Sequence, residues 1–226
     1  MDDAALPLPL AIWFSPIFPV GAFAYSHGLE WAHEAGDIRD AENLREWLGL
    51  LVERGALRND AILLVAAWSA SRRRDSAELA EINELALAAA TSRERHLETT
   101  TQGNAFHLAA RKSWSCDALD LIASDDGDLA YPVAVAVAAS GHDLPLDSTL
   151  DMFCLGFVSN LVSAAIRLGV VGQTDGQRVL AALLPAVRRT AKACATASLD
   201  DLGASAFRSD LASLQHETQY TRLFRS

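Results

Sequence analysis

The chain has 226 residues, a formal net charge of −10 and 50% hydrophobic residues. The length suffices for one sizeable core, and the negative charge argues against binding to a nucleic-acid backbone. The mean hydropathy is +0.13 although 21% of the residues are charged, so apolar surface is left over for a large core or for contacts with other proteins.

The spacing of the cysteines and the length of the apolar segments indicate the cellular compartment. Three cysteines lie far apart and form no Cys-x-x-Cys pair: Cys116, Cys154 and Cys194. This pattern favours reduced thiols. The acidic N-terminus, with an apolar stretch broken by Pro7 and Pro9, is unlike a signal peptide. The longest uncharged apolar segments, 61–70 and 129–141, are too short to cross a bilayer. We therefore expect a soluble, cytoplasmic protein with no membrane span.

The first clear helical pattern follows Asp40, a typical N-cap residue. Its apolar stripe has helical spacing: Leu44, Trp47, Leu48, Leu51 and Val52. Asp75, with Glu78 three residues later, resembles a capping box that opens a second helix over 76–90. The buried face of that helix is expected at Leu79, Ile82 and Leu85 or Ala86.

The segment after Tyr131 gives conflicting signals. Val133, Val135 and Val137 alternate with alanines, which is a strand pattern. However, alanine favours helices, and Pro132 suits a first helical turn. No second strand of similar quality exists to pair with it, so we predict a buried helix.

Two further helices follow in the C-terminal half. Residues 147–168 carry apolar side chains at spacings of three and four: Leu150, Cys154, Phe157, Leu161 and Ala165. Gly169 and Gly172 end this helix. The next helix begins after residues 174–176, and Pro185 should kink or break it.

These patterns predict an all-α fold, a single-domain bundle of eight to ten helices with short connections. We expect the helical domain to span 1–215, with a flexible C-terminal tail over 216–226. A short helical stretch over 209–214 leads into that tail.

Candidate metal ligands do not complete a site. His27, Glu30 and Glu34 are expected on one helical face, and His-x-x-Glu is half of a di-iron carboxylate signature. The second half is missing. The pair at 216–217 begins like a zinc-protease motif, but Tyr220 stands where a second histidine is required. We expect no fixed metal.

The N-terminal motif, residues 13–30, combines prolines, glycines and aromatic residues. This composition describes a rigid, buried turn that feeds a helix starting near Tyr25. From composition alone it is a packed cap on the bundle. The residues expected to build it are Pro16, Phe18, Pro19, Gly21, Tyr25, His27 and Glu30.

The tail, residues 216–226, is unusual for a chain end. Free termini are commonly polar and frayed, whereas this one holds Tyr220, Leu223 and Phe224 together with Arg222 and Arg225. Aromatic residues and arginine are the types that anchor interfaces. Packing on the chain's own bundle and docking to a partner are equally compatible with this composition.

Several motifs together resemble one known family. They are SPIFPVGAFAYSHGLE at 15–30, YPVA at 131–134, SNLVSAA at 159–165, GQTDGQ at 172–177, and the tail itself. In this order they resemble the urease accessory protein UreF family, over essentially the whole chain. Two departures are Val170-Val171, where the family commonly has Pro-Leu, and Thr221, where Ser is usual.

The resemblance implies an all-helical, homodimeric and non-catalytic factor for the maturation of nickel urease. Family members bind UreD, called UreH in some organisms, and the pair recruits the GTPase UreG to the urease apoprotein. GTP is bound by that GTPase and nickel passes through the complex, so no tightly bound cofactor is expected in this chain. Nucleic acid and membranes are not expected partners.

The resemblance also assigns roles to tail residues. In the family an arginine two residues before the Phe is implicated in GTPase recruitment, and Arg222 occupies that position. Tyr220 and Phe224 are expected to anchor the tail. The remaining expected partner-binding residues are Leu223, His216 and Glu217. The N-terminal motif is assigned to positioning the helix that follows it.

Two other function classes stay open from the residues themselves. One is an enzyme or binder, either a helical metalloprotein using His27 and Glu30 or a protein that holds a small molecule inside the bundle. The other is a structural dimer with no link to a GTPase. Tightly held metal would favour the enzyme, and failure to capture a GTPase would favour the structural dimer.

Overall fold

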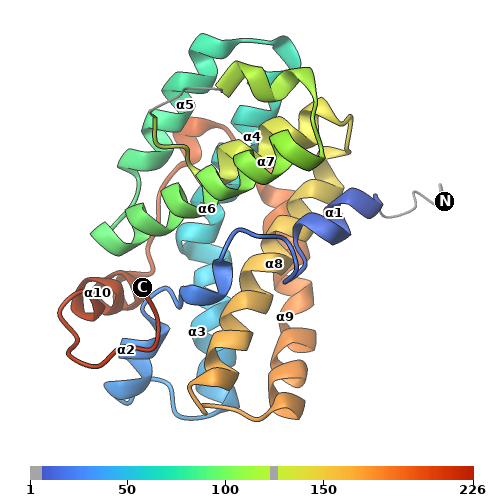
Figure 1. Cartoon of the computed structure of the whole chain (residues 1–226). Coiled ribbons are helices and arrows are strands. Elements are labelled where there is room, and N and C mark those ends of the chain that lie inside the picture. The colour runs from blue at the N-terminus through green and yellow to red at the C-terminus, as the bar shows by residue number, and fades with distance from the viewer. Residues whose placement is uncertain (1–6, 123–126) are drawn as a thin grey trace.

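The computed structural model describes residues 7–122 and 127–226 of the chain. Within these residues the chain forms ten α-helices, three short 3-10 helices and no strand (Figure 1). The predicted all-α, single-domain fold is therefore confirmed.

The first five helices are α1 (Leu8–Trp13), α2 (Leu29–Glu34), α3 (Ala41–Arg54), α4 (Ala56–Arg73) and α5 (Ser76–Ala88). The other five are α6 (Arg93–Ser113), α7 (Tyr131–Gly141), α8 (Leu146–Arg167), α9 (Gln173–Cys194) and α10 (Phe207–His216). The 3-10 helices are η1 (Ala22–Ala24), η2 (Asp117–Ile122) and η3 (Leu199–Asp201).

Helix α7 lies at the centre of one half of the bundle and packs against α4 and α6. Every residue from Pro132 to Ser140 is buried. A helix covered on all sides needs no polar face, which explains why alternating valine and alanine form a helix here. The prediction of a buried helix in this segment is confirmed.

The capping predictions for α3 and α5 are also confirmed. Asp40 Oδ1 accepts a hydrogen bond from the backbone N–H of Asn43 at 2.9 Å, and Asp75 Oδ1 accepts one from Glu78 at 3.0 Å. Of the two candidates for the buried face of α5, Ala86 is the inward residue, because it is buried and Leu85 is exposed.

The other half of the bundle is built on α8 and α9, with α3 and α4 packed against them. Helix α9 continues through Pro185, so no break occurs there. Leu183, Ala186 and Val187, which flank the proline, are buried in the bundle. We attribute the continuity to this packing, which offsets the one backbone hydrogen bond that proline cannot make.

Among the described residues, α8 alone is long and apolar enough to cross a membrane by length and composition, a point that the sequence analysis missed. Half of its most apolar window is buried inside the bundle. Core helices of soluble proteins pass the same test, so the composition of α8 is explained by its packing against α4 and α9.

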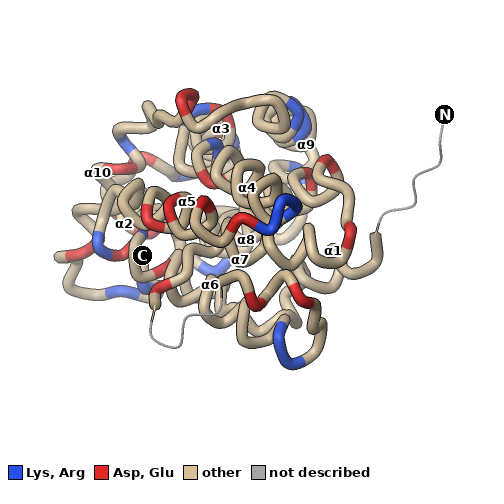
Figure 2. Tube along the Cα trace, turned by 90° about the horizontal axis from the view of Figure 1, so that it is seen from above, with Lys and Arg blue, Asp and Glu red and all other residues tan. Residues whose placement is uncertain are grey.

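The topology brings the N-terminal motif to the C-terminal end of the chain. The last residues run back beside η1 and α2, while α10 packs on α2 (Figure 1). Basic residues lie dispersed among acidic ones along the chain trace in Figure 2. The two segments that stood out in the sequence therefore form one region of the molecule.

Candidate functional site

The turn before α2 differs from the sequence prediction. The helix was expected to start near Tyr25, but α2 begins at Leu29. His27 and Gly28 have φ values of +55° and +74°, the left-handed region, which prevents helix propagation. A Cβ on Gly28 would lie 2.5 Å from the backbone nitrogen of Ser213 in α10. The glycine therefore allows the motif and α10 to pack backbone against backbone.

This turn corrects the expected arrangement of the metal-ligand candidates. His27 lies outside α2, so it shares no helical face with Glu30 and Glu34. Among the described residues, no group of three or more histidine, cysteine, aspartate or glutamate side chains is arranged to hold a metal ion. Glu30 and Glu34 instead both bind the tail.

Glu30 holds the backbone of the tail. Its Oε1 accepts the N–H of Leu223 at 2.7 Å, and its Oε2 accepts the N–H of Phe224 at 2.9 Å. Oε2 also lies 3.1 Å from Nε2 of His216. A nearly buried carboxylate thus receives three hydrogen bonds from groups near the end of the chain, which compensates for its burial.

His216 links Glu30 to a second carboxylate. Its side chain is 0% exposed, and its Nδ1 lies 2.7 Å from Oε2 of Glu94 in α6. The ring therefore bridges the carboxylates of Glu30 and Glu94.

Arg222 completes this cluster from the surface. Its Nη1 donates to Oε1 of Glu94 at 2.8 Å, and its side chain is 41% exposed. Among the described residues, Glu94 is the one acceptor of the guanidinium. The Glu30–His216–Glu94–Arg222 cluster, here called the tail clasp, thus joins α2, α6, α10 and the tail.

The remaining contacts hold the tail along its length. The backbone N–H of Arg225 donates to Ala24 O at 2.8 Å, and that of Ser26 donates to Ser226 O at 2.7 Å. Phe224 is 3% exposed, and the Arg167 guanidinium lies 4.4 Å from the centre of its ring. This geometry is a cation–π contact. The tail lies against the bundle through backbone and side-chain contacts alike.

The predicted partner-binding residues are placed differently from one another. Tyr220 is fully exposed and Leu223 largely so. Phe224 and His216 point inward, so neither is available to a partner while the tail is docked. Glu217 Oε1 accepts the first backbone N–H of α6, that of Arg93, at 2.8 Å. Of the predicted partner-binding residues, Tyr220, Arg222 and Leu223 therefore face outward.

A second buried polar group lies beside the tail clasp. Nε2 of His27 is 2.8 Å from Arg95 Nη1 and 2.8 Å from Glu98 Oε1. Arg95 also hydrogen-bonds Glu98 and lies 3.7 Å from Asp60. Ser226 Oγ donates to Glu98 Oε2 at 3.2 Å, which connects this group to the end of the tail.

Burial and the local charges set the protonation of this group. Burial raises the pKa of Asp60 to about 6, although Arg95 opposes it. Burial also disfavours the charge of Glu98, but Arg95 and the hydrogen bonds from Arg95 and His27 outweigh it and lower that pKa to about 2. Burial and Arg95 lower the pKa of His27. The group is thus centred on a charged Arg95–Glu98 pair.

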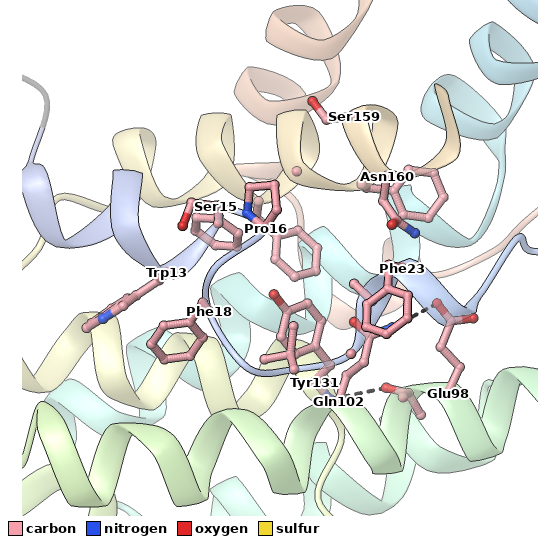
Figure 3. A pocket seen from close by; sticks show the side chains of 18 of the residues that line it. Trp13, Ser15, Pro16, Phe18, Phe23, Glu98, Gln102, Tyr131, Ser159 and Asn160 are labelled. Atoms are coloured by element: carbon pink, nitrogen blue, oxygen red, sulfur yellow. Dashed lines mark hydrogen bonds between the residues drawn. The ribbon is translucent and has the colours of Figure 1, made fainter. Parts of the chain in front are cut away.

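A cavity of about 300 Å³ lies between α6 and α8, covered by residues 15–23. Figure 3 shows Pro16, Phe18 and Phe23 of this cover facing Tyr131 and Gln102 on the helices below. Gln102 Nε2 donates to Glu98 Oε1 at 3.0 Å, so the cavity adjoins the buried polar group. Its size is at the lower end for small-molecule pockets.

The structure places the expected motif residues around this cavity and the tail. Five of them line the cavity: Pro16, Phe18, Pro19, Gly21 and His27. Tyr25 is buried, and its carbonyl accepts from Asn160 Nδ2 of α8 at 3.2 Å. His27 belongs to the buried polar group and Glu30 to the tail clasp. The motif therefore covers the cavity and also binds the tail.

The sequence analysis missed the residues of α6 and α8 that complete the site. Glu94, Arg95 and Glu98 are buried or nearly so, although they are charged and close together in one helix. A usable signal was present, because residues 93–98 contain one aliphatic residue and yet begin a 21-residue helix. If such a helix start is buried, its charged residues have to be paired with one another. Arg167 carried no comparable signal.

Comparison with known proteins identifies the family. The sequence model of the UreF family matches residues 38–184. A urease accessory protein UreF of Methylobacterium radiotolerans is 53% identical over 225 residues, covering 99% of this chain and 98% of that protein. Relatives of the same name in Xanthobacter autotrophicus and Rhodopseudomonas palustris are 55% and 52% identical, covering 97% and 100% of this chain and 90% and 98% of their own lengths. The chain belongs to the urease accessory protein UreF family.

Proposed function

We propose that this chain is a non-catalytic cytoplasmic scaffold for urease maturation. Bound to UreD (UreH), it recruits and regulates the GTPase UreG, which carries the GTP and drives nickel insertion into the urease apoprotein. The chain acts as a homodimer, and nickel passes through the complex without a fixed site in this protein. Family membership over the full length of the chain supports this proposal.

One observation carries the assignment of the recruiting surface. Arg222 is tethered by one nitrogen and remains 41% exposed between Tyr220 and Leu223, whose side chains point outward. Arginine and tyrosine are among the residue types enriched at interface hot spots. A guanidinium recognises a carboxylate through two parallel hydrogen bonds. We propose that Arg222 meets a carboxylate of the GTPase.

The buried ionisable groups support a structural rather than a catalytic use. His216 is hydrogen-bonded between Glu30 and Glu94, and His27 contacts Glu98 and Arg95. Each of these side chains has polar partners within the fold, which is how buried ionisable residues are accommodated in structural clusters.

The test is capture of the GTPase by the complex of this chain with UreD. Arg222→Ala should abolish capture while UreD stays bound. Arg225→Ala is the matched control: Arg225 is an exposed arginine three positions away, and its contact to Ala24 is made by the backbone. Arg225→Ala should therefore capture the GTPase normally. Wild-type capture by Arg222→Ala, or equal loss in both variants, contradicts the assignment.

A further inference from the structure

We infer that Glu94 is a positioning residue for Arg222: it fixes the guanidinium in the orientation that a partner carboxylate meets. This inference rests on the proposed function, because it concerns how the recruiting arginine is presented. Glu94 contacts Arg222 through Oε1 at 2.8 Å and lies on α6, far from the tail in sequence.

Glu94 is itself held in place within the fold. Its Oε2 lies 2.7 Å from Nδ1 of the fully buried His216, and the other nitrogen of that ring lies 3.1 Å from Glu30. The carboxylate is therefore held by one oxygen from inside the fold, and its other oxygen is offered to Arg222. A carboxylate held in this way does not reorient when the tail moves.

Two different carboxylates hold the tail backbone and the Arg222 side chain. Glu30 binds the N–H groups of Leu223 and Phe224, whereas Glu94 binds the guanidinium. Removing the Glu94 carboxylate thus frees the side chain of Arg222 and leaves the Glu30 hydrogen bonds to the tail in place. The two carboxylates have distinct and separately testable effects.

The guanidinium of Arg222 keeps N–H donors that do not contact Glu94. A guanidinium has five N–H donors, and Nη1 supplies the hydrogen bond to Glu94. Among the described residues, no other acceptor contacts the guanidinium, so its remaining N–H donors stay available at the surface. A partner carboxylate can bind these donors without displacing Glu94. A fixed side chain also loses less conformational freedom on binding. The contact therefore presents Arg222 rather than masking it.

The experiment measures the affinity of the chain–UreD complex for the GTPase, with UreD retention as the test of folding. Glu94→Ala should weaken binding about tenfold or more. Glu94→Gln should stay within about threefold of wild type, because its amide oxygen still accepts a hydrogen bond from Arg222. Equal weakening by the two variants overturns the inference. So does unchanged binding or tighter binding by Glu94→Ala, the latter because it would show that Glu94 masks Arg222.

Hydrogen exchange at the amides of Leu223 and Phe224 separates positioning from loss of the tail. In Glu94→Ala these amides should remain as protected as in the wild type, because Glu30 still binds them. Rapid exchange there would show that Glu94 holds the whole tail, and would overturn the specific role assigned to it. Arg222→Ala distinguishes the two proposals: if it binds the GTPase normally, the proposed function fails, whereas normal binding by Glu94→Ala alone defeats only the positioning role.

Discussion

The carboxylate of Glu30 accepts the backbone N–H of Phe224 at 2.9 Å, although 194 positions separate the two residues in the chain. This contact joins the N-terminal motif to the tail, the two segments that the sequence marked as unusual. The motif and the tail are therefore two halves of one site, and a change in either should alter the other.

Replacing Glu30 by glutamine tests this coupling. The amide keeps the shape but removes the charge that accepts two backbone N–H groups and faces His216. We expect a loss of about 2–4 kcal/mol in the free energy of unfolding, because partners of a buried charge are left uncompensated. Urea denaturation measures the loss, and hydrogen exchange over residues 217–226 should accelerate.

Glu34→Gln is the control for that prediction. Glu34 also binds the tail, but through the side chain of Gln219 alone. Its substitution should cost less than about 1 kcal/mol, since a neutral acceptor can still bind the Gln219 amide. Equal losses for Glu30→Gln and Glu34→Gln would show that charge at Glu30 has no special role in holding the tail.

Much of the fold could be predicted from local pattern. The caps at Asp40 and Asp75 and the buried α7 follow from side-chain chemistry and helical spacing within a few residues. The start of α2 could not be predicted in this way. It depends on the left-handed backbone at His27, a non-glycine residue, and on the close approach of α10 to Gly28. That approach is a tertiary contact, which a local pattern does not contain.

The site was predicted in part. Composition marked the tail and the motif, but it did not show that Glu30 binds the tail or that His216 is buried between two carboxylates. Glu94 and His216 lie 122 positions apart, so their pairing follows from how α6 and α10 meet. The roles expected for Tyr220 and Arg222 remain predictions, to which the structure adds their exposure.

Ending the chain after His216 tests whether the tail is docked in solution. The composition was equally compatible with a tail packed on the bundle and with a tail that docks to a partner. The structure predicts a loss of about 2–4 kcal/mol, because Phe224 is 3% exposed and its burial alone contributes about 2 kcal/mol. Urea denaturation followed by circular dichroism measures the loss. An unchanged midpoint would mean that the tail is detached in the free chain.

Gly28→Ala should be strongly destabilising, and Gly21→Ala provides a matched comparison. Both glycines have φ near +74°, which costs alanine about 1–2 kcal/mol. At Gly21 the added Cβ would meet no atom within 4 Å, whereas at Gly28 it would lie 2.5 Å from the backbone of Ser213. We expect Gly28→Ala to cost at least about 2 kcal/mol more than Gly21→Ala in chemical denaturation. Equal costs would contradict the close packing of the motif on α10.

Asp60→Asn should become more stable relative to the wild type as the pH rises from about 4 to 7. The pKa of Asp60 is raised from 3.8 to about 6 by burial, so in this window the folded chain keeps a proton that the unfolded chain has lost. The contribution of Asp60 to the free energy of unfolding therefore falls as the pH rises, and Asp60→Asn removes this pH dependence. Because the side chain is 27% exposed, we expect a relative gain of about 1–3 kcal/mol. Urea denaturation of both proteins across this range measures it, and a difference independent of pH would show that Asp60 ionises normally in the fold.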